Sequence, residues 1–316
     1  MNEYKTKFES QESVILAIVM SIYIIFSIYF FPILLVIAPV PFIIYGVKTD
    51  LKSCLLSLIA TFLTVGVLFD SLTSLLLFLI LVPYTLVCIY MIKKRVKAIK
   101  VVLYSASILF ISILLLFSIL KVGGFDLASK LEENFSQTLS IQMDMLSEMG
   151  LTTYELLEKR DSLRSYFETA LMIFPSITFI SIFIGSYINY LLVSLGLSKI
   201  GISILNIPEF SRLRLPDNFA IGTLIMLLTA FLIRWMNISY ADSIYVNIMV
   251  LIGAFLFAQG LSVINYFLLK IKMKKFFRVL AYIFVFLTPQ IILGVSTLGG
   301  IDIIFDLRKI KGAKSK

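Results

Sequence analysis

The sequence predicts an all-α integral membrane protein, a bundle of about 8–9 transmembrane helices with a helical hairpin on the extracytoplasmic side. Of its 316 residues, 59% are apolar and 15% are charged, whereas average soluble domains are roughly 45–50% apolar and about 25% charged. The apolar residues form continuous runs, unlike the alternating pattern of barrel strands. Because lipid offers no hydrogen-bond partners, such runs must satisfy their own backbone as helices.

Five spans are expected within residues 13–121, after a polar cytoplasmic segment at residues 1–12. The first apolar run is too long for one span of about 20 residues, and it contains Pro32, Pro39 and Pro41. It has no small-residue cleavage site, which indicates a retained helix and not a secretory signal. The expected helices cover residues 13–31, 33–46, 53–69, 72–92 and 101–121.

Residues 122–165 are rich in charge and are expected to form a helical hairpin outside the hydrocarbon. Gly150 is a stop signal, and Thr152 with Glu155 forms a capping-box pattern that starts the second arm. An apolar stripe with a helical period of four packs against the other arm or contacts a partner. The stripe consists of Leu127, Leu131, Phe135 and Leu139.

The second membrane region, residues 166–305, is expected to hold three or four spans, at about 169–196, 219–236 and 244–269 and within 279–305. Pro289 and the pair Gly299-Gly300 interrupt the last stretch, and a break at the glycines would let the chain re-enter toward the inner face. The number of crossings, between eight and ten, therefore stays open. A basic tail, 306–316, ends the chain.

Basic residues in the short loops predict a cytoplasmic N-terminus in a bacterial-type cell membrane, because loops rich in lysine and arginine stay inside. This orientation places loops 47–52, 93–100, 197–217 and 270–278 on the inner side. The clusters Lys93–Lys100 and Lys270–Arg278 either determine topology alone or also bind anionic lipid head groups.

Several function classes lack the residues that they need. The net charge of +9 lies beside apolar spans, so no nucleic-acid partner is expected. The chain has no histidine, and Cys54 and Cys88 lie in apolar runs where buried thiols are usual. No catalytic set, metal-ligand set or phosphate loop is present. We therefore expect no enzyme activity and no cofactor, and any uphill transport would need energy from a partner.

Five amide side chains inside the predicted spans are the candidates for a ligand pocket: Asn189, Asn247, Gln259, Asn265 and Gln290. Polar groups at membrane depth usually face the bundle interior, where they line a pocket or bond to other helices. No charged residue lies clearly in the middle of a predicted span, which argues against a proton pump or an ion-coupled transporter.

Short stretches of the C-terminal half, in this order and spacing, resemble the YybS-like family of predicted bacterial membrane proteins. That resemblance implies a membrane topology and assigns no biochemical activity. The stretches are Phe174-Pro175 through Tyr187-Ile188-Asn189-Tyr190, Arg212-Leu213-Arg214-Leu215-Pro216, Ala258-Gln259-Gly260-Leu261, and Gly300-Ile301-Asp302 through Phe305-Asp306-Leu307-Arg308.

The start of the chain, residues 11–121, is also similar to the S component of an energy-coupling-factor vitamin transporter. The similarity consists of a first helix with small residues and a short proline-bearing second helix that ends at Pro41 to Gly46. It implies that Ala17 and Ser21, four residues apart, face an ATPase-driven coupling module, although Ser21 stands where alanine is expected.

Two hypotheses follow from these resemblances. The chain binds a small organic solute in a pocket near the outer face, or it is a non-transporting scaffold that contacts another envelope membrane protein.

Overall fold

A computed structural model describes residues 2–205, 207–216, 218–236 and 240–309, with side chains described from Gln11 onward except for 127 and 128. Helices are the only regular elements among these residues. Their bounds are α1 (Asn2–Phe30), η1 (Pro32–Ile37), α2 (Pro39–Lys48), α3 (Leu51–Leu68), α4 (Ser71–Lys93), α5 (Ala98–Val122), α6 (Leu127–Glu148), α7 (Thr153–Lys199), η2 (Phe210–Arg212), α8 (Phe219–Trp235), α9 (Ala241–Lys270), α10 (Lys275–Leu287) and α11 (Pro289–Phe305).

The described helices confirm the predicted fold class. Six of them are long and apolar enough to cross a membrane, a seventh candidate is the bent pair α10 and α11, and two shorter apolar helices cover Pro32–Lys48 and Phe219–Trp235. The polar N-terminus differs from expectation, because α1 begins at Asn2 and continues the first span without a break. The long helix α7 confirms that the second hairpin arm continues into an apolar span.

The chain divides into two compact units. Unit 1 comprises Met1–Leu151 and Ser181–Ile207, and unit 2 comprises Thr152–Ile180 and Pro208–Lys316. The sequence predicts the hairpin 122–165 as one region, whereas its two arms belong to different units. Helix α7 contributes to both units, so sequence order alone does not separate them.

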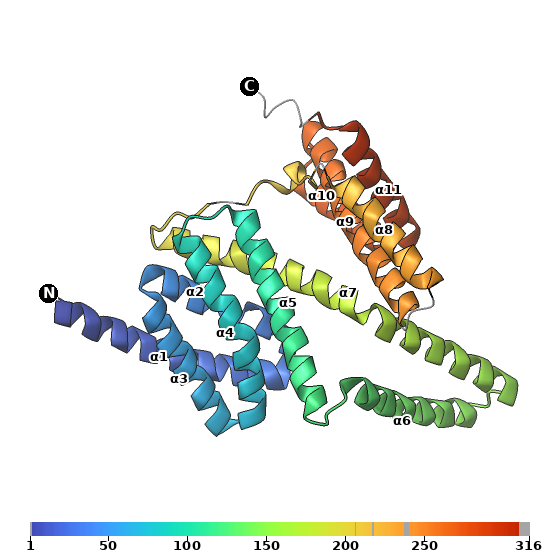
Figure 1. Ribbon diagram of the computed structural model, residues 1–316, viewed down its shortest axis with the longest axis horizontal. Helices are drawn as coiled ribbons and strands as arrows, with labels where there is room; N and C mark the ends of the chain where they lie inside the picture. Colours follow the sequence, from blue (N-terminus) through green and yellow to red (C-terminus); the bar gives the residue numbers. More distant parts are fainter. Residues whose placement is uncertain (1, 206, 217, 237–239, 310–316) are drawn as a thin grey trace. The chain divides into compact units, whose positions relative to one another are not determined.

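Unit 1 is built around a large apolar core. In it α3 packs against α1 and α4, α5 packs on α4, and the short α2 lies against α3 and α4 (Figure 1). Phe42, Leu58 and Tyr84 are among its fully buried side chains. Asp50 and Asp70 cap the starts of α3 and α4 by accepting backbone hydrogen bonds from Ser53 and Thr73, which satisfies orphan donors at both helix ends.

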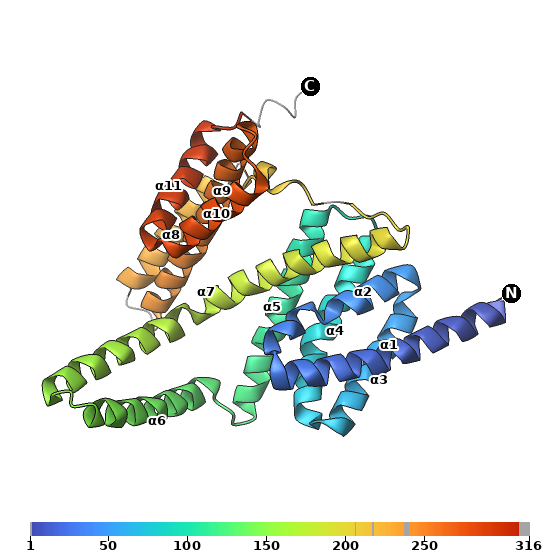
Figure 2. The ribbon, with the colours of Figure 1, turned by 180° about the vertical axis from the view of Figure 1, so that it is seen from behind.

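Unit 2 has a much smaller apolar core, formed by Leu261, Val285 and Val295. Helix α9 packs against α8 and α11, and α10 lies against α11 (Figure 2). Two glycines allow α9 and α11 to approach closely. A Cβ added to Gly260 would lie 1.9 Å from the Val295 carbonyl oxygen, and one added to Gly299 would lie 2.0 Å from the Leu256 carbonyl oxygen.

The last apolar stretch breaks at Pro289, one of the two interruptions that the sequence predicts, and not at the other. Helices α10 and α11 meet at an angle of 109°, and Thr288 at the junction has an extended backbone just before Pro289. The predicted break at Gly299-Gly300 is wrong, because α11 continues through both glycines. Gly299 serves helix packing instead, and the proline, which cannot continue a helix, makes the bend.

Candidate functional site

The five amides proposed as pocket residues do not come together in one place. Asn189 belongs to unit 1, whereas the other four belong to unit 2. Gln259 and Asn189 are buried, Asn247 and Asn265 are half-buried, and Gln290 is exposed near the start of α11.

Asn189 is part of a small buried polar cluster in unit 1. Its amide nitrogen donates to the Val36 carbonyl oxygen at 2.9 Å and to the Tyr84 hydroxyl at 3.1 Å. Its amide oxygen and the hydroxyl of Ser186 are buried without a hydrogen-bond partner among the described residues. Asn189 therefore connects α7 with η1 and α4, which is the interhelical role that polar groups in membranes often have.

Asn247 makes a similar connection in unit 2. Its side-chain oxygen accepts from the Ser176 amide at 2.9 Å, and its side-chain nitrogen donates to the Met172 carbonyl oxygen at 2.7 Å. Both partners lie on α7, so these bonds join α7 to α9.

Ala17 and Ser21, proposed for docking to a coupling module, are buried against α3. The hydroxyl of Ser21 donates to the Ala17 carbonyl oxygen at 2.7 Å and lies 3.2 Å from the Thr61 carbonyl oxygen. This face of α1 is therefore occupied within the chain itself.

A buried ion pair lies in unit 2, at the C-terminal end of α11. The Arg308 guanidinium donates to one carboxylate oxygen of Asp302 at 2.8 Å, and both side chains are almost fully buried. The Gln259 amide donates to the same oxygen at 2.7 Å. The other oxygen of Asp302 is buried and has no hydrogen-bond partner among the described residues.

The same ion pair joins the segment before α8 to the rest of the unit. Arg308 donates to the carbonyl oxygens of Ser211 and Leu213, each at 2.8 Å, and to the Ser262 hydroxyl at 2.6 Å. The Leu215 amide donates to the Gln259 side-chain oxygen at 3.0 Å. A second ion pair, Arg214 with Asp306 at 2.9 Å, lies alongside.

This network, hereafter the Asp302–Arg308 network, takes most of its residues from three of the four stretches that carry the family resemblance, and Ser211 and Ser262 stand directly beside two of them. The sequence points to Gln259 but not to Asp302 and Arg308, because Asp302 stands near the end of an apolar stretch and Arg308 stands in a basic tail. The available signal was an acidic residue inside an apolar helix, six positions before an arginine. Asp302 lies in the last turn of α11 and Arg308 lies beyond its end, so neither contradicts the expectation that no charged residue lies in the middle of a span.

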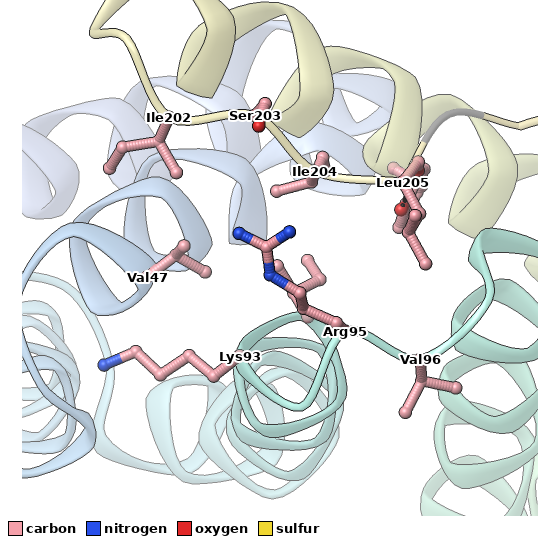
Figure 3. Close-up of a pocket in the computed structure, with 10 residues that line it drawn as sticks. Val47, Lys93, Arg95, Val96, Ile202, Ser203, Ile204 and Leu205 are labelled. Atoms are coloured by element: carbon pink, nitrogen blue, oxygen red, sulfur yellow. Dashed lines mark hydrogen bonds between the residues drawn. The ribbon is translucent and has the colours of Figure 1, made fainter.

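A cavity of about 160 Å³ lies at the end of unit 1 that carries the basic loops. Its walls are the ends of α2 and α4, Tyr190 of α7, and the segment 202–205. The Tyr190 hydroxyl donates to the Leu205 carbonyl oxygen and holds this segment in place. The Arg95 guanidinium points into the space between Val47 and Ser203 (Figure 3).

A larger cavity of about 370 Å³ lies between α1, α2 and α7 of unit 1. Its lining is mostly aliphatic, with the hydroxyl-bearing Tyr23 on one wall and Lys199 at the end of α7. The Tyr23 hydroxyl donates to the Leu34 carbonyl oxygen at 2.7 Å. The charged side chain of this lining is Lys199.

Neither unit offers a metal centre within the described residues, where acidic and cysteine side chains form no cluster of three or more. Cys54 and Cys88 are both buried free thiols, as expected.

Comparison with known families gives one match. The family described as Predicted membrane protein (DUF2232) matches residues 14–303 of the chain. Searches of curated proteins and of solved structures find no match.

Proposed function

Because the chain belongs to the DUF2232 family of predicted membrane proteins, we propose that it is a cell-membrane protein whose unit 1 binds a small organic solute. The larger cavity of unit 1 carries this proposal. Its volume of about 370 Å³ lies within the range of small-molecule sites, which is roughly 300–1,000 Å³.

The lining of this cavity favours an amphiphilic solute with an anionic end. Met20, Ile37 and Leu192 offer apolar walls, and Lys199 offers a cation at one end. With the N-terminus in the cytoplasm, Lys199 lies at the inner end of α7. The site is then in the inner half of the membrane and not near the outer face, where the sequence suggested a pocket.

The composition of unit 1 also supports the likeness to an S component. Five helices from α1 to α5 and the second part of α7 lie in one compact unit, together with the less apolar α6. We propose that an ATPase-driven partner would supply energy for transport, since the chain has no phosphate loop. That partner would use another surface than Ala17 and Ser21, which α3 covers.

Native mass spectrometry of gently purified protein tests solute binding. The wild type is expected to retain a small molecule, and Leu195→Trp to lose it, because Leu195 is an exposed cavity-lining residue whose enlargement fills the site. Leu191→Trp is the matched control, one turn earlier on the same helix and outside the lining. Wild-type protein that carries no small molecule would contradict the proposal.

The alternative function, an envelope scaffold, is favoured by one feature of α6. Ile141 and Met145 are exposed four residues apart on this helix, which lies outside the apolar spans, and Met149 is exposed just beyond its end. A photo-crosslinker at Met145 is expected to trap an envelope membrane protein if this surface docks one. The same group at Glu132, on a different face of α6, is the control, and equal labelling at both sites would argue against docking.

Cysteine labelling tests the proposed orientation. Because both native cysteines are buried, a single added cysteine reports its own location. Glu132→Cys is expected to react with an impermeant maleimide in intact cells, and Lys97→Cys only after the membrane is opened. The reverse result would place the N-terminus outside.

A further inference from the structure

The smaller cavity of unit 1 has a basic side chain that nothing in the described structure neutralises. Two cations, Lys93 and Arg95, line it. Lys93 donates to the Thr49 carbonyl oxygen at 2.8 Å. The Ser53 hydroxyl holds the pKa of Asp50 below its ordinary value, and the nearby charge of Lys93 lowers that pKa further. Lys93 thus has an anionic neighbour, whereas no described carboxylate forms an ion pair with Arg95.

The backbone at Arg95 is in a conformation that normally selects glycine. Its φ is +52°, and two hydrogen bonds close the end of α4 around it: Arg95 N to Ile92 O at 2.9 Å and Val96 N to Met91 O at 3.1 Å. This is a Schellman motif, in which glycine is usual because a Cβ is disfavoured in the left-handed region. Arginine at this position therefore carries a conformational cost that glycine would avoid.

Lys272 shows what the same motif looks like without a cavity. Its φ is +54°, and the bonds Lys272 N to Leu269 O and Met273 N to Leu268 O close the end of α9 in the same way. A basic residue near a helix C-terminus is favourable by itself, so the motif alone carries no inference. The difference is that the Arg95 side chain, although exposed to solvent, points into an open cavity (Figure 3), and Lys272 is not part of that lining.

We propose that this cavity binds a phosphoryl group, carried by an anionic phospholipid of the inner leaflet. A guanidinium presents a planar fork of donors that matches phosphate oxygens in a bidentate manner. About 160 Å³ holds a charged group and is smaller than sites that enclose a whole small molecule. The cavity lies at the end of the α4 span, where a lipid head group meets the protein while its chains stay in the bilayer.

This site is separate from the solute cavity, because the two share no lining residue. Binding of a phosphoryl group at Arg95 and loss of a solute in Leu195→Trp are therefore independent results.

The test uses the purified full-length chain in detergent, titrated with phosphatidylglycerol, phosphatidylcholine or inorganic phosphate, with bound species counted by native mass spectrometry. Arg95→Gly is expected to weaken phosphatidylglycerol binding by about tenfold, as the loss of a charged hydrogen-bonding group usually does. Lys272→Gly is the matched control, with the same charge change at the same backbone position, and it should bind like the wild type. Phosphatidylcholine is expected to bind more weakly than phosphatidylglycerol.

Both variants should remain folded, because glycine suits the left-handed position, and both should raise the thermal midpoint. If phosphatidylglycerol binding weakens equally in the two variants, the effect comes from the overall charge of the protein, and the proposal is overturned. Phosphatidylglycerol binding that is unchanged in Arg95→Gly would overturn it as well. Inorganic phosphate that binds through Arg95 without any preference for phosphatidylglycerol would support the phosphoryl site and overturn the lipid as its source.

Discussion

The two units of this protein are held together by different means. Unit 1 has a broad core of aliphatic and aromatic side chains, and buried polar groups such as Asn189 connect neighbouring helices in it. Unit 2 has a small apolar core and depends on close glycine contacts and on the Asp302–Arg308 network. In a bilayer, apolar burial hardly distinguishes helix contacts from lipid contacts, so specific packing and polar bonds decide which helices associate. The difference predicts that unit 2 is more sensitive to single polar changes than unit 1.

The largest effect is expected for Arg308→Ala. It leaves the Asp302 carboxylate buried without its cation, which typically costs about 3–5 kcal/mol of unfolding free energy. Arg212→Ala is the control, because its pair with Glu209 is exposed and has a distance of 3.7 Å; such pairs contribute about 0–1 kcal/mol. Thermal unfolding of unit 2 in detergent, followed by proteolysis at 208–216, measures both. Similar losses in the two variants would show that the buried pair has no special role.

The next effect concerns the glycine contact of α9 with α11. Gly260→Ala and Gly299→Ala would place a methyl group against backbone carbonyl oxygens, and overpacking of this kind costs about 1–3 kcal/mol. Gly253→Ala and Gly294→Ala lie on the same helices with open space around them, and they should be neutral or stabilising by up to about 1 kcal/mol. Thermal midpoints of the four variants measure the contrast. If all four behave alike, helix propensity and not the close contact decides the result.

A smaller effect is expected in unit 1 for Asn189→Ala. It removes the bonds to Val36 and Tyr84, and interhelical hydrogen bonds in membranes average about 0.6 kcal/mol, with a maximum near 1.7 kcal/mol. Asn247→Ala is the counterpart in unit 2 and should cost a similar amount. Titration of both variants with a denaturing detergent measures the free energy of unfolding of each. A loss in Asn189→Ala as large as in Arg308→Ala would remove the proposed difference between the units.

The smallest effect is a pH dependence at the start of α7. The amide and hydroxyl of Thr152 donate to Glu155, which lowers the pKa of this carboxyl below its ordinary value. A lowered folded-state pKa stabilises the helix start above the ordinary glutamate pKa of about 4.3, and this contribution disappears as the pH falls through the lowered pKa. Hydrogen exchange at residues 153–157 should quicken in that window, beyond the intrinsic pH dependence. Glu155→Gln should remove the extra change, and a persisting change would assign it to another group.

Local signals in the sequence predicted much of unit 1 and the helix ends. The capping box at Thr152 and Glu155 is confirmed by its hydrogen bonds, and α4, Ser71–Lys93, nearly matches the predicted 72–92. These features depend on neighbours within a few residues, which a single sequence displays. The cavities are different, because their walls come from segments such as Val47, Arg95 and Ser203 that only folding brings together.

The sequence by itself determined that lipid surrounds most of this chain and where most helices begin and end, since both follow from the length and polarity of local runs. Only the tertiary structure decided that Asp302 and Arg308 are buried together, that Gly299 is a contact and not a break, and that Arg95 points into a cavity. Gly299 meets Leu256, and Arg95 faces the segment 202–205, across long separations in the sequence. Asp302 and Arg308 are only six residues apart, but they are buried because distant segments, including Ser211, Leu213 and Gln259, close around them.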